Sequence, residues 1–336
     1  MRIEQNFSLE RYNTFHLPVH TRWFVEYADE TELERVLQDE YFQELPSLHI
    51  GGGSNLLFLD DFKGIILHSA IRGIRVAGET DDAVWLQVGA AETWDHVTAW
   101  AAENGWGGIE NLSLIPGETG AAAVQNIGAY GAEIKDVLES VEAYLPTAEK
   151  RIFTNEACRY GYRDSYFKDE NHAPCIITSV TLRLTKQPVF NLAYNNLEEI
   201  LADSAPRTVA KVREAIIRIR REKLPDPDKW GNAGSFFVNP VVSQEQFSRL
   251  KRDYPSMPSY PLKDGYVKLS AGWLIEQCGF RGKRVGATGV YEHQALVIVN
   301  YGGATGNEIA LFAENIREAV CQRFGVTLTP EVKYIS

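Results

Sequence analysis

Two glycine-rich segments are the first features of the chain that could do chemistry. Residues 51–55 read GGGSN directly after a strand-like LHI, and residues 115–134 read IPGETGAAAVQNIGAYGAEI. Glycines let backbone N–H groups approach an anion, and a run of small side chains suits a surface against a flat ring. A tight structural turn and a close-packed helix crossing are the alternative interpretations. Together the segments favour an extended cofactor that contains a pyrophosphate.

The spacing of the first glycines excludes two common nucleotide motifs. A dinucleotide fingerprint would need glycine where Leu56 stands and a helix after it, whereas a β-like LLFLD follows. A Walker A loop would need a Gly-Lys-Ser/Thr sequence, which does not follow these glycines.

Ser235 lies in a third glycine-containing segment, GNAGSFFVNP (231–240), just before an expected strand. The segment is not a G-x-S-x-G nucleophile elbow, and no histidine lies near it in sequence. The serine hydroxyl could instead donate a proton in a water-poor pocket. A hydroxyl that only caps a turn is the alternative.

Charged residues supply the remaining candidates. Arg163 in YRDS could bind a carboxylate bidentately, although an arginine beside Asp164 also suits a structural ion pair. Glu331 in TPEVKYI would, taken alone, be a solvated strand residue. The densest basic cluster could bind a phosphate or simply form a charged helix face; it comprises Arg218, Arg220, Arg221 and Lys223.

Composition limits the class of protein. The chain has 336 residues, with 34 Lys+Arg against 45 Asp+Glu and a net charge of −11. This balance disfavours nucleic-acid and anionic-membrane binding. No apolar run of signal-peptide or membrane-spanning length occurs, so we expect a cytoplasmic protein.

Metal binding has no support in the sequence. The four cysteines, Cys158, Cys175, Cys278 and Cys321, are far apart, and the seven histidines contain no H-E-x-x-H. Structural metal sites need closely spaced ligands, so we expect no metal and buried free thiols instead.

Alternating strand-like and helix-like stretches must position these candidates, which indicates an α/β or α+β protein. Expected strands cover residues 23–28, 46–50, 62–69, 82–90, 141–146, 175–185, 295–300 and 331–335. Expected helices cover residues 29–42, 92–105, 209–223, 270–279 and 306–325. The sequence LPDP at 224–227 is the best internal boundary, and we expect the last dozen residues to return to the first unit.

Seven motifs in order carry a resemblance that none would carry alone. They are YNTF (12–15), GGGSN (51–55), ENLSLIPGETGAAAVQNIGAYG (110–131), YRDS (162–165), LPDP (224–227), GNAGSFF (231–237) and PEV (330–332). This set resembles the UDP-N-acetylenolpyruvoylglucosamine reductase family, in its longer form with a tyrosine loop. The motifs span essentially the whole chain.

The resemblance implies an α+β fold. The family has an FAD-binding domain of the vanillyl-alcohol-oxidase type, made of two α+β subdomains, and a smaller α+β substrate-binding domain. We expect the first subdomain at 1–70 plus 325–336, the second at 71–224 and the substrate domain at 225–324.

The resemblance also implies the reaction and its cofactor. NADPH reduces noncovalent FAD, and the flavin N5 then passes a hydride to C3 of UDP-N-acetylglucosamine enolpyruvate, giving UDP-N-acetylmuramate for peptidoglycan synthesis. The residues implied to bind FAD are Gly51, Gly52, Gly53, Ser54, Asn55, Leu56, Ile115, Pro116, Gly117, Gly120, Gln125, Asn126, Gly128, Ala129 and Arg220.

The resemblance assigns catalytic and substrate roles as well. Arg163 and Glu331 would stabilise an enolate-like intermediate, and Ser235 would protonate C2. The residues implied to bind substrate are Tyr162, Tyr194, Lys223, Asn239 and Gln294. Two departures from the family pattern are Asn195, where glycine is common, and Trp230.

Two other interpretations are weighed. Another noncovalent FAD oxidoreductase of this fold, acting on an alcohol or lactone, would leave GNAGSFF and PEV unexplained. A binding or regulatory protein that had lost catalysis would lack Arg163, Ser235 or Glu331, and all three are present. We expect a monomeric enzyme whose partners are small molecules.

Overall fold

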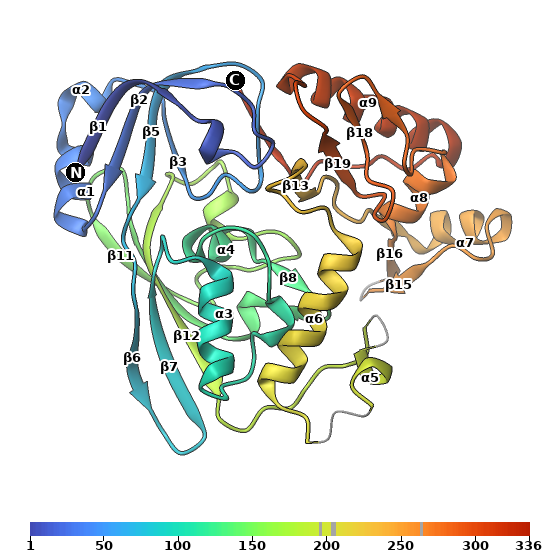
Figure 1. Ribbon diagram of the computed structural model, residues 1–336, viewed down its shortest axis with the longest axis horizontal. Helices are drawn as coiled ribbons and strands as arrows, with labels where there is room; N and C mark the ends of the chain where they lie inside the picture. The colour runs from blue at the N-terminus through green and yellow to red at the C-terminus, as the bar shows by residue number, and fades with distance from the viewer. Residues whose placement is uncertain (195–196, 203–205, 263–264) are drawn as a thin grey trace. The chain divides into compact units, whose positions relative to one another are not determined.

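The computed structural model describes residues 1–194, 197–202, 206–262 and 265–336 (Figure 1). The chain divides into two compact units. Unit 1 comprises Met1–Phe7, Thr21–Gly52 and Lys63–Arg220, and unit 2 comprises Ser8–His20, Gly53–Phe62 and Arg221–Ser336. The three-domain division expected from the sequence stays a prediction.

The first sheet of unit 1 has the strand order β1-β2-β5-β3. Its strands are β1 (Arg2–Ser8), β2 (His20–Tyr27), β5 (Phe62–Ser69) and β3 (Ser47–Ile50). The apolar side of helix α1 (Glu30–Gln38) packs on this sheet through Leu33 and Val36.

The helix expected over residues 29–42 is wrong as one element. Asp29 caps α1 as expected, but Asp39 is extended and accepts hydrogen bonds from the backbone N–H groups of Tyr41 and Phe42. An aspartate that competes for backbone donors in this way starts a new helix, α2 (Glu40–Gln43).

The second sheet of unit 1 is antiparallel, with the order β11-β10-β12-β7-β6 (Figure 1). Its strands are β6 (Ile74–Glu79), β7 (Ala83–Gly89), β10 (Leu138–Tyr144), β11 (Lys150–Thr154) and β12 (Ile176–Thr185). Helices α3 (Trp94–Glu103) and α4 (Thr119–Gln125) share its buried core through Trp94, Val97 and Ala123. Two short strands, β8 (Gly128–Ala129) and β9 (Ala132–Glu133), follow α4.

Helix α6 (Val209–Lys223) has the bounds that the sequence predicts. Its expected apolar face is buried, through Val212, Ile216 and Ile219, and packs with Leu197 of the short helix α5 (Leu197–Ile200). This face fixes which side of α6 turns outward, and therefore where its arginines lie.

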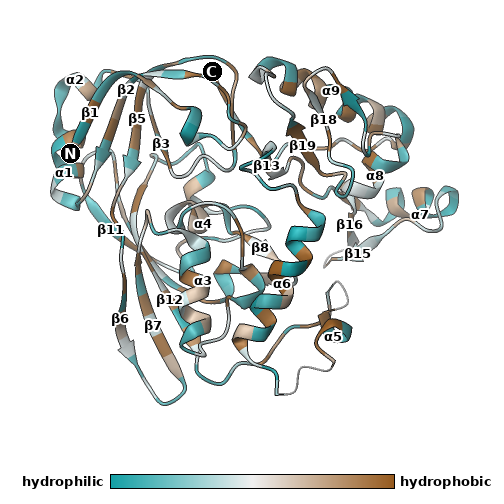
Figure 2. Cartoon of the chain, viewed as in Figure 1, coloured by the Kyte–Doolittle hydropathy of each residue, from teal (hydrophilic) through white to brown (hydrophobic). Residues whose placement is uncertain are grey.

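In the part of unit 2 that the structure describes, small groups of strands pack with the α-helices α7, α8 and α9. The order β13-β19-β18-β17 is antiparallel, β14-β16-β15 is antiparallel, and β4 pairs with β20 in parallel. Figure 2 shows β19 as one of the most apolar strands of this unit. The elements are β4 (Leu56–Phe58), β13 (Gly231–Ser235), β14 (Val241–Ser243), α7 (Gln244–Asp253), β15 (Ser259–Pro261), β16 (Tyr266–Leu269), α8 (Ala271–Gln277), β17 (Arg284–Val285), β18 (Thr288–Val290), β19 (Val297–Asn300), α9 (Gly306–Phe324) and β20 (Lys333–Ile335).

The end of the chain pairs with one early strand inside unit 2, and the expected place of residues 325–336 in the first subdomain stays a prediction. Leu56 lies opposite Lys333 where β4 and β20 run in parallel. The residues just after the glycine turn and those just after Glu331 are therefore neighbours in unit 2.

The expectation that all four thiols are buried is wrong. Cys158 is buried, Cys175 and Cys278 are half-buried, and Cys321 is exposed on the outer side of α9. Among the described residues, every helix is too short or too polar to cross a membrane.

Candidate active site

The glycine turn after β3 has a steric requirement that the sequence pattern only suggested. Gly53 has φ +67°, and a Cβ there would lie 1.9 Å from the carbonyl oxygen of Tyr12. Only glycine fits such an approach. Gly51 and Gly52 belong to unit 1, where a Cβ on Gly52 would lie 3.9 Å from the Cα of Gly117. The GGGSN turn and the 114–120 segment, which leads into α4, are therefore neighbours, as the expected cofactor surface requires.

The 114–120 loop has its own constraints. Leu114 adopts φ +57°, a left-handed conformation that is unfavourable for a bulky side chain. Gly120 is buried, and a Cβ there would lie 2.9 Å from the Cβ of Ala90. Between them, Ile115 and Gly117 are half-buried and Pro116 is exposed. Of the expected cofactor residues in this segment, Ile115, Pro116 and Gly117 are therefore accessible, whereas Gly120 packs closely against Ala90.

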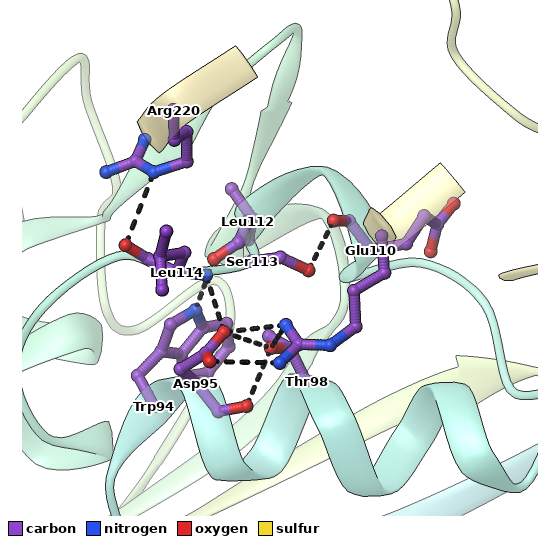
Figure 3. Close-up of polar contacts among 9 residues, drawn as sticks. Trp94, Asp95, Thr98, Glu110, Leu112, Ser113, Leu114 and Arg220 are labelled. Carbon is purple, nitrogen blue, oxygen red and sulfur yellow. Dashed lines mark hydrogen bonds and ion pairs between the residues drawn. The ribbon is translucent and has the colours of Figure 1, made fainter. Parts of the chain in front are cut away.

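Arg220 supplies a positive charge beside this loop. Its Nε donates to the carbonyl oxygen of Leu114 at 3.3 Å, as Figure 3 shows, and its side chain hydrogen-bonds Tyr130. Burial lowers the pKa of its guanidinium from the ordinary value. In the described part of the chain, no carboxylate forms an ion pair with it. A half-buried cation beside two converging glycine segments fits an anionic, diphosphate-containing cofactor.

The side chain of Arg163 is bound by backbone carbonyl groups of the segment that follows α4. Its guanidinium donates to the carbonyl oxygens of Gly128 at 2.6 Å and Asn126 at 3.2 Å. A Cβ on Gly128 would lie 2.9 Å from Cγ of Glu133 and 3.0 Å from Nη1 of Arg163, so a side chain there would crowd both residues. Ala129 continues the same strand, β8. The structure thus joins YRDS to the QNIGA segment, as the arrangement of one site requires.

Asn126 and Gln125 differ in their surroundings. The Asn126 amide is buried and donates to Glu133 Oε2 at 3.0 Å and to the carbonyl oxygen of Gly161 at 2.7 Å. It is therefore committed to the fold. Gln125 is half-buried and accepts a hydrogen bond from Lys168 Nζ at 3.3 Å, and Lys168 also donates to the carbonyl oxygen of Arg163 at 2.7 Å. Sequence reasoning missed Lys168, although it lies shortly after YRDS.

The two candidate tyrosines of unit 1 are exposed. Tyr162 is 41% exposed and its ring centroid lies 5.5 Å from Cζ of Arg163. Tyr194 is 45% exposed, and its ring lies where a side chain on Gly131 would be, with Cε2 2.4 Å from a Cβ there. Asn195 lies outside the described residues.

Ser235 ends strand β13 instead of preceding a strand, which corrects the sequence interpretation. The pairing with β19 is irregular between Asn232 and Ser235, and Gly234 has φ +67°. A bulge of this kind turns the following side chain out of the regular alternation. Ser235 is accordingly exposed, between buried neighbours Ala233 and Phe236.

Glu331 lies beside the Ser235 segment in unit 2. Its N–H donates to the carbonyl oxygen of Phe236 at 2.8 Å, and Phe237 pairs with Pro330. Its own carbonyl oxygen accepts from the Asn55 amide at 3.1 Å. Ser54 and Leu56 flank Asn55 and are half-buried. The structure thus brings the ends of three sequence motifs together: GGGSN, GNAGSFF and PEV.

The remaining substrate candidates of unit 2 are more scattered. Lys223 is the exposed last residue of α6. Asn239 Oδ1 accepts from the N–H of Ala271 at 3.0 Å, and Gln294 Oε1 accepts from the N–H of Leu296 at 3.3 Å. Trp230 packs edge-on against Tyr301, with ring centroids 5.2 Å apart.

Comparison with known protein families assigns both parts of the chain. Residues 21–152 match the family described as FAD binding domain. Residues 226–335 match the C-terminal domain of UDP-N-acetylenolpyruvoylglucosamine reductase. The half-buried Arg220 and the converging glycines described above fit the flavin dinucleotide that the first match names.

Whole-length relatives carry the same description. The UDP-N-acetylenolpyruvoylglucosamine reductase of Porphyromonas gingivalis is 52% identical over 337 residues and covers 100% of both chains. Those of Bacteroides fragilis and Pseudomonas aeruginosa are each 45% identical and cover 99% and 98% of this chain.

A solved structure agrees with the fold. The reductase of the same description from Thermus caldophilus superposes with a TM-score of 0.70 at 25% identity and covers 100% of both chains. The α+β class with an FAD-binding domain of the vanillyl-alcohol-oxidase type is therefore confirmed.

Proposed function

The chain belongs to the UDP-N-acetylenolpyruvoylglucosamine reductase family, and we propose the reaction and the residue roles that follow from this. The protein reduces the enolpyruvyl group of UDP-N-acetylglucosamine enolpyruvate to a lactyl ether, giving UDP-N-acetylmuramate for peptidoglycan synthesis. NADPH is the reductant. FAD, when bound, carries the hydride from NADPH to C3 of the enolpyruvyl group.

FAD binding falls to residues of the two glycine segments and to Arg220. Backbone N–H groups of Gly51, Gly52 and Gly117 can approach a diphosphate without steric hindrance from side chains. The guanidinium of Arg220 offers charge-assisted hydrogen bonds to the same group. Such a contact would replace part of the hydration that Arg220 loses on burial.

Hydride arrival at C3 leaves negative charge on C2 and the neighbouring carboxylate, and this charge has to be stabilised. Arg163 takes this role, because two carbonyl oxygens hold its guanidinium in one orientation. A donor that is already oriented costs little reorganisation when charge develops. We assign the same stabilising role to Glu331, which follows Pro330 in unit 2.

Ser235 donates the proton to C2. The bulge at Gly234 turns its side chain outward from β13. A serine hydroxyl has a far higher ordinary pKa than a usual general acid, so its alkoxide must be stabilised and quickly reprotonated. Tyr194, Tyr162, Lys223, Asn239 and Gln294 bind the substrate.

One observation carries the proposal furthest: the backbone hydrogen bond from Glu331 to Phe236. It joins the PEV and GNAGSFF motifs, which lie far apart in sequence. An FAD oxidoreductase that acts on an alcohol or lactone would have no need to combine an acid and a serine here. This contact therefore favours the reductase over that alternative.

An anaerobic titration of the purified holoenzyme tests the proposal. NADPH is added first, and UDP-N-acetylglucosamine enolpyruvate second, while visible absorbance is recorded. We expect the flavin bands to bleach with NADPH and return with the substrate. Bands that bleach and do not return would favour the alcohol or lactone oxidoreductase, and failure to bind supplied FAD would overturn both. The monomeric state and cytoplasmic location remain predictions, and gel filtration checks the first.

A further inference from the structure

Leu114 is a point of backbone strain at the edge of the FAD-binding loop. Its φ of +57° is a conformation that glycine adopts easily and a leucine does not. Strain of this kind persists only where surrounding contacts hold the backbone in place. Ile115, Pro116 and Gly117, all proposed FAD contacts, follow directly. The contacts that hold Leu114 therefore decide where this part of the loop lies.

The N–H of Leu114 donates to Oδ1 of Asp95 at 2.5 Å (Figure 3). Asp95 lies in the first turn of α3, whose N-terminus favours a carboxylate. Arg213 of α6 binds the same carboxylate bidentately, at 2.6 Å to Oδ1 and 2.9 Å to Oδ2. Thr98 donates to Oδ1 at 3.1 Å. Hydrogen bonds from two helices therefore hold the Asp95 carboxylate, from Thr98 in α3 and from Arg213 in α6.

The carbonyl side of Leu114 is held by the same helix α6. Arg220 donates to this carbonyl oxygen at 3.3 Å. Arg213 and Arg220 are two turns apart on one face of α6, as the helical period requires. One helix therefore holds both ends of the strained residue, directly through Arg220 and through Asp95 by way of Arg213.

We propose that Asp95, held by Arg213, is a positioning residue for FAD binding, which keeps Leu114 in its left-handed conformation. Neither residue needs to touch the cofactor. This inference rests on the proposed FAD site, and it adds two residues that the sequence motifs do not contain. Bidentate geometry explains why an arginine is used, because both carboxylate oxygens must be held for Oδ1 to face the loop.

Reconstitution of apoprotein with FAD tests the inference by a dissociation constant and not by turnover. For Asp95→Ala we expect FAD affinity to fall about tenfold to hundredfold, the usual range for loss of a hydrogen bond to a charged group. Asp95→Asn keeps an acceptor for the Leu114 N–H but loses one of the two oxygens that Arg213 binds, so its affinity should lie between those of wild type and Asp95→Ala.

A second substitution separates positioning from simple structural support. Leu114→Gly removes the conformational cost, so the double variant Asp95→Ala/Leu114→Gly should recover most of the lost affinity. Leu114→Gly alone serves as its reference. If Asp95 only joined α3 to α6, the double variant would bind FAD as weakly as Asp95→Ala, and the inference would be overturned.

One control and one substitute variant complete the design. Glu276→Ala breaks an exposed ion pair with Arg281, 2.8 Å long, and should leave FAD affinity unchanged. If Asp95→Ala does not fold, Arg213→Gln is used with the same Leu114→Gly rescue. Wild-type protein that binds no FAD would contradict the proposed function itself. Wild type that binds FAD while Asp95→Ala binds it equally well would contradict this inference alone.

Discussion

At the scale of single residues, Ser235 carries the most specific chemical claim. For Ser235→Ala we expect NADPH to reduce the flavin at nearly the wild-type rate, because a hydroxyl lost from β13 does not affect that hydride transfer. Reoxidation by substrate should slow about 10²-fold to 10⁴-fold, the usual contribution of a general acid. Stopped-flow absorbance of each half-reaction measures both rates.

Ser243 provides the matched control for this prediction. It also ends a strand in unit 2, but its hydroxyl accepts from the N–H of Gln246 and caps α7. Ser243→Ala should cost about 1 kcal/mol of stability and leave both half-reactions unchanged. Equal slowing of the two half-reactions in Ser235→Ala would refute its role as proton donor.

Gly128 tests whether the orientation of Arg163 matters. Gly128→Ala places a methyl group 2.9 Å from Cγ of Glu133 and 3.0 Å from both the carbonyl oxygen of Ala132 and Nη1 of Arg163, so the β8–β9 turn and the guanidinium are both crowded. We expect kcat for the substrate half-reaction to fall about tenfold or more, since a donor that is displaced by a fraction of an ångström stabilises developing charge poorly. Gly78→Ala in β6 is the control, because nothing lies within 4 Å of a Cβ there. Equal kinetics in the two variants would contradict the role of Arg163.

At the scale of elements, the sequence predicts the helices that local residue patterns determine. It does not predict the short strands that form only by pairing with a distant part of the chain. Helix α6 was predicted over its observed residues because its apolar face and the following prolines are local signals. Short strands such as β17 and β18 carry no such signal, since each forms only by pairing with another. The break at Asp39 was missed because the capping side chain interrupts an otherwise continuous helical pattern.

The residues of the candidate site also fall into two groups, those that sequence motifs identify and those that only the folded structure identifies. Glycines and the motif residues Arg163, Ser235 and Glu331 could be named from the sequence by their resemblance to a family. The contacts of Lys168 and Asp95 could not, because a lysine in a loop or an aspartate at a helix start has many ordinary roles. Only the folded chain reveals that their partners are backbone atoms of the site.

The Tyr194 segment gives a prediction at this scale. It is tied to unit 1 because the Asn191 amide donates to the carbonyl oxygen of Gly131 at 3.1 Å. Tyr194→Phe keeps the ring that packs there and removes the hydroxyl, so KM for substrate should rise about threefold to tenfold with FAD affinity unchanged. Tyr41→Phe, on an exposed surface of unit 1, should change neither quantity. An unchanged KM in Tyr194→Phe would exclude the residue from substrate binding.

At the scale of the whole molecule, the main electrostatic feature is an excess of negatively charged side chains. The net charge is −11 and the isoelectric point is about 5.2, so self-repulsion weakens as the pH falls toward 5. Any variant that keeps the same charge shares this effect. A comparison between two such variants therefore isolates the contribution of one half-buried group to the pH dependence of stability.

His49 is such a group, and it lies in β3, two positions before the first glycine of the GGGSN turn. Its Nε2 lies 2.8 Å from the Tyr27 hydroxyl, and removal from water, aided by the charge of His68, lowers the pKa of His49 to about 3. In the unfolded chain the pKa is about 6.5. The unfolded state therefore binds the proton first as the pH falls. The stabilising contribution is fully present above about pH 6.5 and is lost progressively toward pH 3.

His49→Gln keeps a hydrogen-bonding partner for Tyr27 and cannot titrate. Between pH 6 and 4 the unfolding equilibrium constant of the wild type should rise by up to about a hundredfold more than that of the variant, or about 2.7 kcal/mol. Urea unfolding at several pH values measures this difference. His293→Gln, at an exposed histidine, should follow the wild type. If the unfolding equilibrium constant of His49→Gln changes with pH as that of the wild type does, the pKa of His49 is not lowered by folding. In that case β3, which leads into the FAD-binding turn, does not make stability depend on pH through this residue.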